Sequence, residues 1–340
     1  MTIDGVPVEE FGNIVVKRAY SGVGTSGLCT SSLTFSVPAP LTASIAAPVE
    51  ITGVEGLPPF YIASRVPSGS VINVTCYDRM AFAAAELPSE DINTSDGLIS
   101  IGSIVDIIVH TIGAIDRWGG LPDWLSLQYI SVDSFTGLTC SEILERIAKA
   151  GAGIWQIQRF AAGDDISLSF VSFPSTSSSV QIEEHTALAI GADYEIKGIN
   201  ATDGEGNVYI RGDTSTEYNT LNISSEYITA EGATEIWDKV REEAVTAVQC
   251  DKCIMPAVLT AASSITFAQH PGTTYRINSI TAHITRSGIF GTIACTPPSS
   301  DEIGMSGKLT RAVDNAVGYN RKTGIQRVTR YQGIITEVEA

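Results

Sequence analysis

The sequence predicts a mainly β protein in which two small β-barrel domains flank a compact α/β insert. Residues 1–86 are rich in short runs of β-branched and aromatic residues, separated by clusters of Gly, Pro and Ser. Helical periodicity first appears after about residue 87, and β-rich runs return later in the chain. We therefore expect a first β-barrel domain at 1–86, the α/β insert at 87–174 and a second β-barrel region at 175–340, with residues 175–235 packed against either barrel.

The first β region contains five short runs that fit strands. Turn-forming residues separate them: Ser68 and Gly69 precede the fifth run, and Gly53 and Gly56 lie next to the fourth. This spacing is typical of a small sandwich or barrel. The expected strands are residues 14–20, 32–37, 48–52, 59–63 and 71–77.

The insert is expected to hold two helices followed by two strands. Ser103 is a candidate N-cap for a run whose apolar residues recur at helical spacing as far as Ile115. The second helix has a clearer start, because Thr139-Cys-Ser-Glu142 is a capping box, and Gly151 fits the C′ position. The expected strands are 153–158 and 166–170.

The last region is predicted to return to strands after a linker at 173–179. An acidic helix is expected at 234–248, because Ile236, Val240 and Val248 share one face. The strict alternation of apolar and polar residues near residue 285 predicts a hairpin with its turn at Ser287-Gly288. The expected strands are 207–211, 220–223, 280–286, 289–293 and 332–338.

The charge balance excludes several classes of function. The chain has 38 acidic and 21 basic residues, a formal net charge of −17, and no block of Lys or Arg. Sequence-specific nucleic-acid binding needs a basic face, so it is not expected, and the same holds for anionic membranes. The apolar run 35–51 is interrupted by prolines, and the first residues do not fit a signal peptide. We expect a chain made in the bacterial cytoplasm with no membrane anchor.

Motifs that often carry chemistry are interpreted here as structural. Gly22-Val-Gly24-Thr-Ser-Gly27 matches a dinucleotide fingerprint, but a strand rather than a helix is expected after it. Cys250-Asp-Lys-Cys253 is a single pair that is expected to close a helix, so neither zinc nor redox chemistry is predicted. A triad assembled from distant residues stays open, but no catalytic, cofactor-binding or metal-binding residue is predicted. The histidines are widely separated: His110, His185, His270 and His283.

The segment Val74-Thr-Cys-Tyr-Asp-Arg-Met80 places a thiol, a phenol, a carboxylate and a guanidinium in four consecutive positions. On an alternating strand, Val74 and Cys76 share one face and Tyr77 lies on the other. Asp78 and Arg79 then stand at the strand end, where a turn, a helix cap or a salt bridge suits them. The segment is interpreted as a joint between the first β region and the insert.

The order of three segments resembles the baseplate hub proteins of phage and phage-like tails, especially those of Gram-positive hosts. The segments are Val71-Ile-Asn-Val-Thr-Cys-Tyr-Asp-Arg-Met80, then Leu138-Thr-Cys-Ser-Glu-Ile-Leu-Glu-Arg-Ile-Ala148 followed by Gly151, and then the segment Tyr275 to Ile289. The resemblance extends over about residues 10–335. It implies a non-enzymatic trimer in which each chain supplies two similar tube domains, so that three chains match a hexameric tail tube above and a trimeric spike below.

The same resemblance implies the partners and the location. The expected partners are a second and third copy of the chain, the tail tube protein, the spike or tip protein, a baseplate wedge or LysM-type adaptor, and the tape measure protein. The expected location is the tail baseplate of a virion or of a phage-like particle such as a contractile injection system. If a polyanion passes through the ring, the acidic excess predicts a negatively charged lumen.

Two other functions remain as alternatives. A glycan- or receptor-binding tail tip module requires an exposed aromatic platform, for which Trp118, Trp124 and Tyr129 are the candidates. A cell-wall hydrolase requires a carboxylate pair or a metal triad in a cleft, and the sequence proposes neither.

Overall fold

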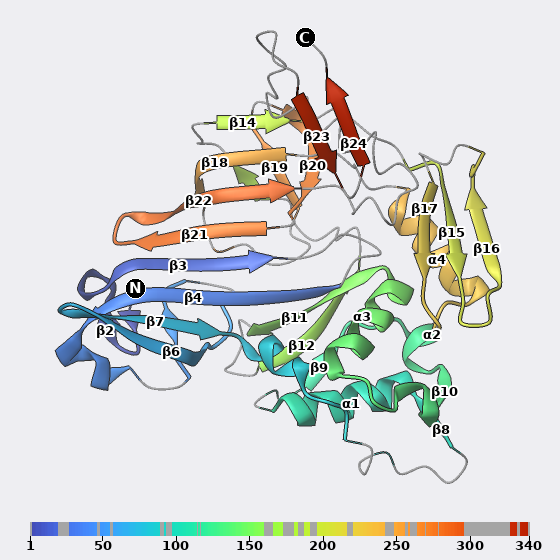
Figure 1. The fold of residues 1–340 in the computed structure, drawn as a ribbon, viewed down its shortest axis with the longest axis horizontal. Coiled ribbons are helices and arrows are strands. Elements are labelled where there is room, and N and C mark those ends of the chain that lie inside the picture. Colours follow the sequence, from blue (N-terminus) through green and yellow to red (C-terminus); the bar gives the residue numbers. More distant parts are fainter. Residues whose placement is uncertain are drawn as a thin grey trace.

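The fold is that of a computed structural model, shown in Figure 1. The structure describes residues 2–19, 27–45, 48–54, 57–88, 92, 97–113, 115, 117–159, 166–172, 180–182, 187–190, 196–215, 220–241, 248–255, 258, 264–268, 270–277, 279–295, 327–331 and 334–338. The expected linker at 173–179 and the glycine loop at 22–26 lie outside these residues. In the described part of the chain, no helix is both long and apolar enough to cross a membrane.

Strands from the start, middle and end of the chain form one 11-stranded sheet. Its order is β14-β18-β22-β21-β3-β4-β11-β12-β9; in addition, β7 pairs with β4, and β6 pairs with β7. The bounds are β3 (Gly12–Ala19), β4 (Leu28–Pro38), β6 (Tyr61–Ser68), β7 (Val71–Tyr77), β9 (Arg117–Gly119), β11 (Gly153–Arg159), β12 (Ile166–Ser172), β14 (Ala187–Ile190), β18 (Val248–Met255), β21 (Ser279–Thr285) and β22 (Gly288–Cys295).

Within this sheet, the first and last β regions meet edge to edge. β3 and β21 pair antiparallel, with Val15 opposite His283 and Ala19 opposite Ser279. The run β6-β7-β4-β3-β21-β22-β18-β14 is antiparallel throughout and is called the long ribbon below. The mainly β class with a helical insert is therefore confirmed. The two expected barrels are, among the described residues, open sheets joined to each other.

One face of the long ribbon is apolar because its residues alternate. In β3, Ile14 and Val16 are buried, and in β4 Leu33, Phe35 and Val37 are buried. The ring of Phe11 packs edge-on against Phe35, with ring centroids 5.4 Å apart. Each buried side chain of this size contributes about 1.5–3 kcal/mol, so this face anchors the first half of the fold.

The insert contains α1 (Ile101–Ile112), α2 (Asp123–Ser126) and α3 (Cys140–Gly151). The expected N-cap at Ser103 is wrong by one turn, because the hydroxyl of Ser100 accepts the N–H of Ser103 at 3.1 Å. Ser103 is therefore already inside α1. The helix ends at Gly113, whose φ of 70° requires a residue without a side chain.

The capping box of α3 is confirmed. The Thr139 hydroxyl accepts the N–H of Glu142 at 3.3 Å, and the Glu142 carboxylate accepts the N–H of Thr139 at 2.8 Å. Gly151 is the last helical residue, and Ala152 takes the left-handed position expected for Gly151. A side chain at Gly151 would collide with the ring of Phe170 at 2.7 Å, which explains the glycine by packing rather than by φ.

A small unit packs against the insert. It contains β15 (Gly198–Thr202), β16 (Val208–Gly212), β17 (Thr220–Ser224) and α4 (Ala230–Val240). The expected helix at 234–248 is shifted, because Thr229 is the N-cap and residue 248 begins β18. Arg146 of α3 and Glu226 form an ion pair at 2.8 Å, so this part of 175–235 contacts the insert rather than a barrel. The proposed domain boundaries stay predictions.

The remaining strands form small sheets around the long ribbon. β13 and β14 fall within 175–235 but pair with strands of the last region. The Ser287-Gly288 turn is offset by one residue, because Thr285 pairs with Gly288. The other bounds are β1 (Thr2–Ile3), β2 (Val6–Pro7), β5 (Ile51–Thr52), β8 (Leu98–Ser100), β10 (Tyr129–Ser131), β13 (Val180–Ile182), β19 (Ser264–Phe267), β20 (His270–Arg276), β23 (Arg327–Tyr331) and β24 (Ile334–Val338).

Candidate functional site

The segment Val74–Met80 is a joint, and its side chains divide as the alternation predicts. Val74 and Cys76 are buried, whereas Tyr77 is exposed on the opposite face of β7. Asp78 ends the strand and is the N-cap of the 3₁₀ helix η3 (Arg79–Ala84), which leads toward the insert. Its neighbour Arg79 stacks over the Tyr61 ring at 3.7 Å and therefore takes a packing role.

Asp78 belongs to a buried polar cluster with Arg18 and Ser31. Its carboxylate accepts the N–H of Ser31 at 2.8 Å and that of Met80 at 3.1 Å. The Arg18 guanidinium donates to the Ser31 hydroxyl at 3.1 Å. All three residues are at most 2% exposed. The cluster ties β3 and β4 to the end of β7, at the point where the chain leaves the long ribbon.

Burial raises the pKa of the Asp78 carboxyl to about 6, although hydrogen bonds from Ser31 and the charge of Arg18 act in the opposite direction. The carboxylate is therefore mostly ionised at neutral pH. Its acceptor sites are occupied by backbone N–H groups, and the side chain is shielded from solvent. This arrangement suits a structural anchor and not a general base.

The buried cysteines are poor nucleophiles. Burial raises the pKa of Cys76 to about 12 and that of Cys140 to about 11, so both thiols stay protonated. Cys250 and Cys253 were expected to close a helix, which is wrong, because both are buried in β18 at a shift in strand register. Lys252 between them has a φ of 51°, and the Cys253 thiol donates to the Gly291 carbonyl at 3.2 Å.

No metal-ligand cluster is found among the residues that the structure describes. His110 and His283 are exposed and belong to different elements. The segment Arg211-Gly-Asp213 lies at the end of β16, and Arg211 donates to the Thr234 hydroxyl of α4. These motifs therefore do not converge on one site in the described part of the chain. The side chains of His185 and His270 lie outside it.

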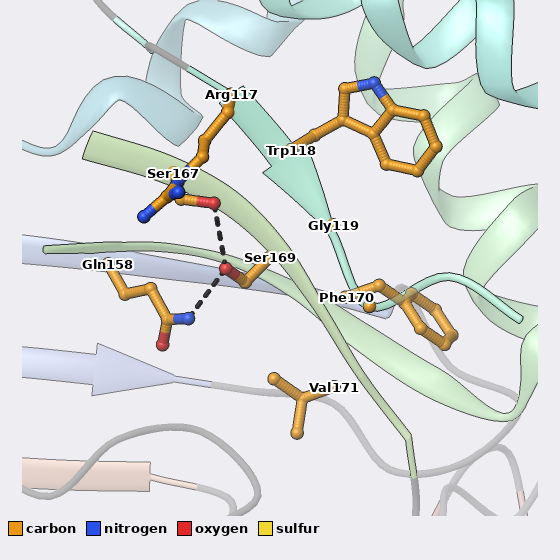
Figure 2. A pocket seen from close by; sticks show the side chains of 9 residues that line it. Arg117, Trp118, Gly119, Gln158, Ser167, Ser169, Phe170 and Val171 are labelled. Atoms are coloured by element: carbon orange, nitrogen blue, oxygen red, sulfur yellow. Dashed lines mark hydrogen bonds between the residues drawn. The ribbon is translucent and has the colours of Figure 1, made fainter. Parts of the chain in front are cut away.

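A pocket of about 390 Å³ opens on β9, β11 and β12, and its wall is a polar ladder (Figure 2). The Gln158 amide donates to the Ser169 hydroxyl at 2.7 Å, and that hydroxyl lies 3.1 Å from the Ser167 hydroxyl. The ladder groups therefore bond to one another, and the described lining contains no carboxylate. The lining residues are Arg117, Trp118, Gly119, Gly120, Gln158, Ser167, Ser169, Phe170 and Val171.

The three aromatic residues of the alternative glycan site do not form a platform. Trp118 is half-buried, and its indole N–H donates to Asp106 of α1. Trp124 is also half-buried, and its ring lies so close to Gly232 of α4 that a Cβ there would sit 2.6 Å away. Tyr129 is the one member with a largely exposed ring, so this surface lacks the paired planes that sugar stacking needs.

The solvent face of the long ribbon is rich in hydroxyl groups. Lys17 on this face stands opposite Ser32 of β4 and Thr281 of β21. The basic side chains that the structure describes on this face are those of Lys17, Lys252 and His283. No carboxylate is found among the side chains described there. The hydroxyl residues are Thr30, Ser32, Thr34, Ser36, Thr75, Thr281, Thr285 and Thr292.

The long ribbon ends in two strands that have a single partner each within the described residues. β6 pairs with β7, and β14 pairs with β18. β6 is exposed from Ala63 to Ser68, with Val66 at 55% and a proline at position 67. Unpaired strand edges are templates for pairing with another chain, and a proline restricts which register is possible.

No family model and no curated protein matches the sequence. Solved structures do match: the 43 kDa tail protein of prophage MuSo2 from Shewanella oneidensis has 17% identity and a TM-score of 0.51, with 86% of this chain and 95% of that chain covered. A tail protein from Neisseria meningitidis MC58 has 10% identity and a TM-score of 0.54, over 87% and 95% of the two chains. A prophage tail protein from Listeria monocytogenes EGD-e has 10% identity and a TM-score of 0.53, over 89% and 100%.

The chain has the fold of phage tail proteins. The likeness covers more than eight-tenths of each pair of chains, so the tail-protein fold includes both the long ribbon and the insert. The resemblance that the order of motifs indicated is confirmed at this level.

Two features of this tail-protein fold were missed from the sequence. The hydroxyl-rich face was visible as the alternation Thr30-Ser-Ser-Leu-Thr-Phe-Ser36, which places polar side chains on one side of a strand. The junction between β3 and β21 gave no local signal, because its residues are far apart in the chain.

Proposed function

We propose that the chain is the structural hub of a tail baseplate and that three copies form a ring. The observation that carries this proposal is the long ribbon, in which two four-stranded halves, β6-β7-β4-β3 and β21-β22-β18-β14, meet at one antiparallel junction. One chain thus supplies two similar units. Three copies provide six such units while keeping three-fold symmetry, which is what an adaptor between a hexameric tube and a trimeric spike requires.

Closure of the ring pairs β6 of one copy with β14 of the next. Both strands lie at the ends of the long ribbon, and closed sheets remove the exposed edges that otherwise cause aggregation. The partners that the family resemblance implies are compatible with this position: the tail tube protein on one side, the spike or tip protein on the other, and a wedge or LysM-type adaptor and the tape measure protein nearby.

The solvent face of the long ribbon lines the ring in this arrangement. In this arrangement a strongly negative wall is not expected from the described part of this face, because its described side chains are hydroxyl groups with Lys17, Lys252 and His283. A largely neutral wall presents little fixed charge to a passing polyanion, and weak attraction is screened within about 8 Å at physiological salt.

A catalytic role is not part of the proposal. The buried thiols are protonated, the Asp78 carboxylate is occupied by backbone N–H groups, and the pocket on β9 and β12 lacks a described carboxylate. The function lies instead in protein–protein surfaces.

Light scattering of the full chain, alone and with the tail tube protein, tests the proposal. A ring gives three times the 36.0 kDa mass of one chain. Val66→Lys adds a charge at the free edge of β6 and should shift the mass toward one chain. Val208→Lys is the matched control, since Val208 is a similarly exposed valine, at 52%, in β16. A wild-type chain that stays monomeric in both conditions contradicts the ring, and a trimeric Val66→Lys variant contradicts closure through β6.

A further inference from the structure

The far end of the insert presents apolar side chains on a two-stranded sheet. β8 and β10 pair antiparallel, with Tyr129 opposite Ser100 and Ser131 opposite Leu98. Because side chains alternate, Leu98 and Tyr129 share one face, while Ile99 and Ile130 share the face that packs into the insert. Leu127, two residues before Tyr129, ends α2 beside this sheet. These three residues, Leu98, Leu127 and Tyr129, are called the distal patch.

The distal patch is strongly exposed. Leu127 and Tyr129 are each 68% exposed, and Leu98 is 44% exposed. A two-stranded sheet on a free surface normally carries polar side chains on its solvent face. Here the solvent face carries an aromatic side chain, Tyr129, and an aliphatic one, Leu98, and Leu127 lies two residues before Tyr129 in the chain. Aromatic residues are enriched where interfaces gain most of their binding energy.

The surroundings of the distal patch are acidic. Asp123, one turn before Leu127 in α2, and Asp133, just after β10, are exposed. Between residues 97 and 135, the described side chains include three carboxylates, one guanidinium (Arg117, on β9) and His110. An apolar centre with a negatively charged rim is complementary to a surface with an apolar socket and a basic rim.

We propose that the distal patch is the docking site for a basic protein of the tail particle. The side chains of Tyr129 and Leu127 would enter an apolar pocket on that protein. A protein is favoured over a glycan because two of the three exposed side chains are leucines, which neither stack on a sugar ring nor bond to its hydroxyl groups. The inference rests on the proposed hub function, since it needs the chain to be part of a tail.

The position of the distal patch keeps it accessible in the proposed ring. In Figure 1, β8 and β10 lie at the lower right, to the right of α1 and away from the ends of the long ribbon at β6 and β14. Ring closure through those two strands therefore leaves the patch uncovered.

Photo-cross-linking in purified tail particles tests this proposal. A photoreactive amino acid replaces Tyr129 in the full chain, and a second chain carries it at Val208, the exposed valine of β16, as a matched control. The expected result is an adduct at position 129, at least tenfold more abundant than at 208, to a segment of another tail protein rich in Lys and Arg. Raising the salt concentration before irradiation should lower its yield, because screening weakens the charged rim.

Leu127→Asp is the accompanying loss-of-function variant. It should reduce the same partner in purified particles at least tenfold, whereas Val208→Asp should leave the partner level unchanged. Adducts only to a copy of the same chain, adducts to an acidic segment, or binding of purified cell-wall glycan at this surface would each overturn the proposal.

The two proposals fail in distinguishable ways. If the chain is absent from the particles, or stays monomeric in light scattering, the hub function fails. If the chain is present as a trimer but position 129 gives no adduct above the control, the hub function stands and the docking site is wrong.

Discussion

The two halves of the long ribbon each contain four antiparallel strands but are held together differently. In both halves a central hairpin, β3–β4 or β21–β22, is flanked by a second antiparallel pair. If the middle pair of the junction, Lys17 and Thr281, is taken as a local two-fold axis, Arg18 corresponds to Ala282. The hairpin partner of Arg18 is Ser31, and that of Ala282 is Gly291.

The third member extends the correspondence. Asp78 follows β7 and donates its N–H to the Ser31 carbonyl, while Cys253 in β18 stands opposite Gly291. The first half therefore buries the guanidinium, hydroxyl and carboxylate of Arg18, Ser31 and Asp78. At the corresponding positions the second half has Ala282, Gly291 and Cys253, which carry no charge. The charged version occurs in the half from which the insert leaves. Equivalent positions in a repeated sheet thus diverge where one copy must also fix the direction of a departing chain.

The largest expected effect comes from breaking the charged version. Asp78→Ala leaves the N–H groups of Ser31 and Met80 without their acceptor and removes a negative charge near buried Arg18. We expect the free energy of unfolding at pH 7 to fall by about 3–5 kcal/mol, measured by urea denaturation. Asp133→Ala, at an exposed carboxylate, is the control and should cost less than about 0.5 kcal/mol. A cost of Asp78→Ala close to that of the control would contradict the role of the cluster.

The pH dependence separates the two halves in a second way. The pKa of Asp78 is raised to about 6 from an ordinary value near 3.9, so the folded state binds this proton more tightly than the unfolded state. Its contribution to stability is therefore greatest below about pH 4 and declines by about 3 kcal/mol as the pH rises through 6. The unfolding free energies of the wild type and Asp78→Ala can be measured from pH 4 to 8. The difference between them should be about 3 kcal/mol smaller at pH 8 than at pH 4. A difference that grows with pH would contradict the raised pKa.

A smaller effect is expected in the uncharged half. A Cβ at Gly291 would lie 1.9 Å from the Thr281 carbonyl and 2.7 Å from the Met255 side chain. Gly291→Ala should therefore cost about 2 kcal/mol through overpacking, measured by thermal unfolding. Gly119→Ala is the matched control, because nothing lies within 4 Å of a Cβ there. Equal stability of the two variants would show that β21 and β22 can separate locally.

The smallest effect tests how firmly the insert is held to its half. Thr139→Ala removes the cap of α3, the helix that packs on β11, and should cost about 1 kcal/mol. Thr139→Ser keeps the hydroxyl and should retain most of the stability. Hydrogen exchange would place the loss in α3 and β11, while the amides of β21 and β22 should be unchanged. Faster exchange in β21 as well would indicate that the two halves open as one unit.

How much of this was predictable depends on the range of the interaction. The limits of β7, the capping box at Thr139 and the β21–β22 hairpin rest on nearby residues, and each was predicted within a residue or two. The start of α1 was missed because Ser100 and Ser103 are both capable caps, and local sequence does not choose between them.

Long-range features were beyond sequence reasoning. The CxxC pair was placed at a helix end, since a run with helical spacing precedes it, but pairing of β18 with β22 imposes a strand there. The pairing of β3 with β21 likewise depends on residues that only tertiary structure brings together. The exposure of Leu98, Leu127 and Tyr129 follows from which face of a hairpin the insert covers, and periodicity alone does not reveal it.

The β3–β21 junction also sets an order of events during synthesis. The edge of β3 is covered only when β21 pairs with it, and the paired residues Val15 and His283 are 268 residues apart in the chain (283 − 15). At about 5–20 residues per second, the ribosome needs roughly 13–54 s to deliver that partner. During that interval the edge of β3 is uncovered, while other copies of the chain are being synthesised on the same mRNA. The Arg18–Ser31 hydrogen bond joins β3 to β4, so both of its partners have been synthesised long before β21.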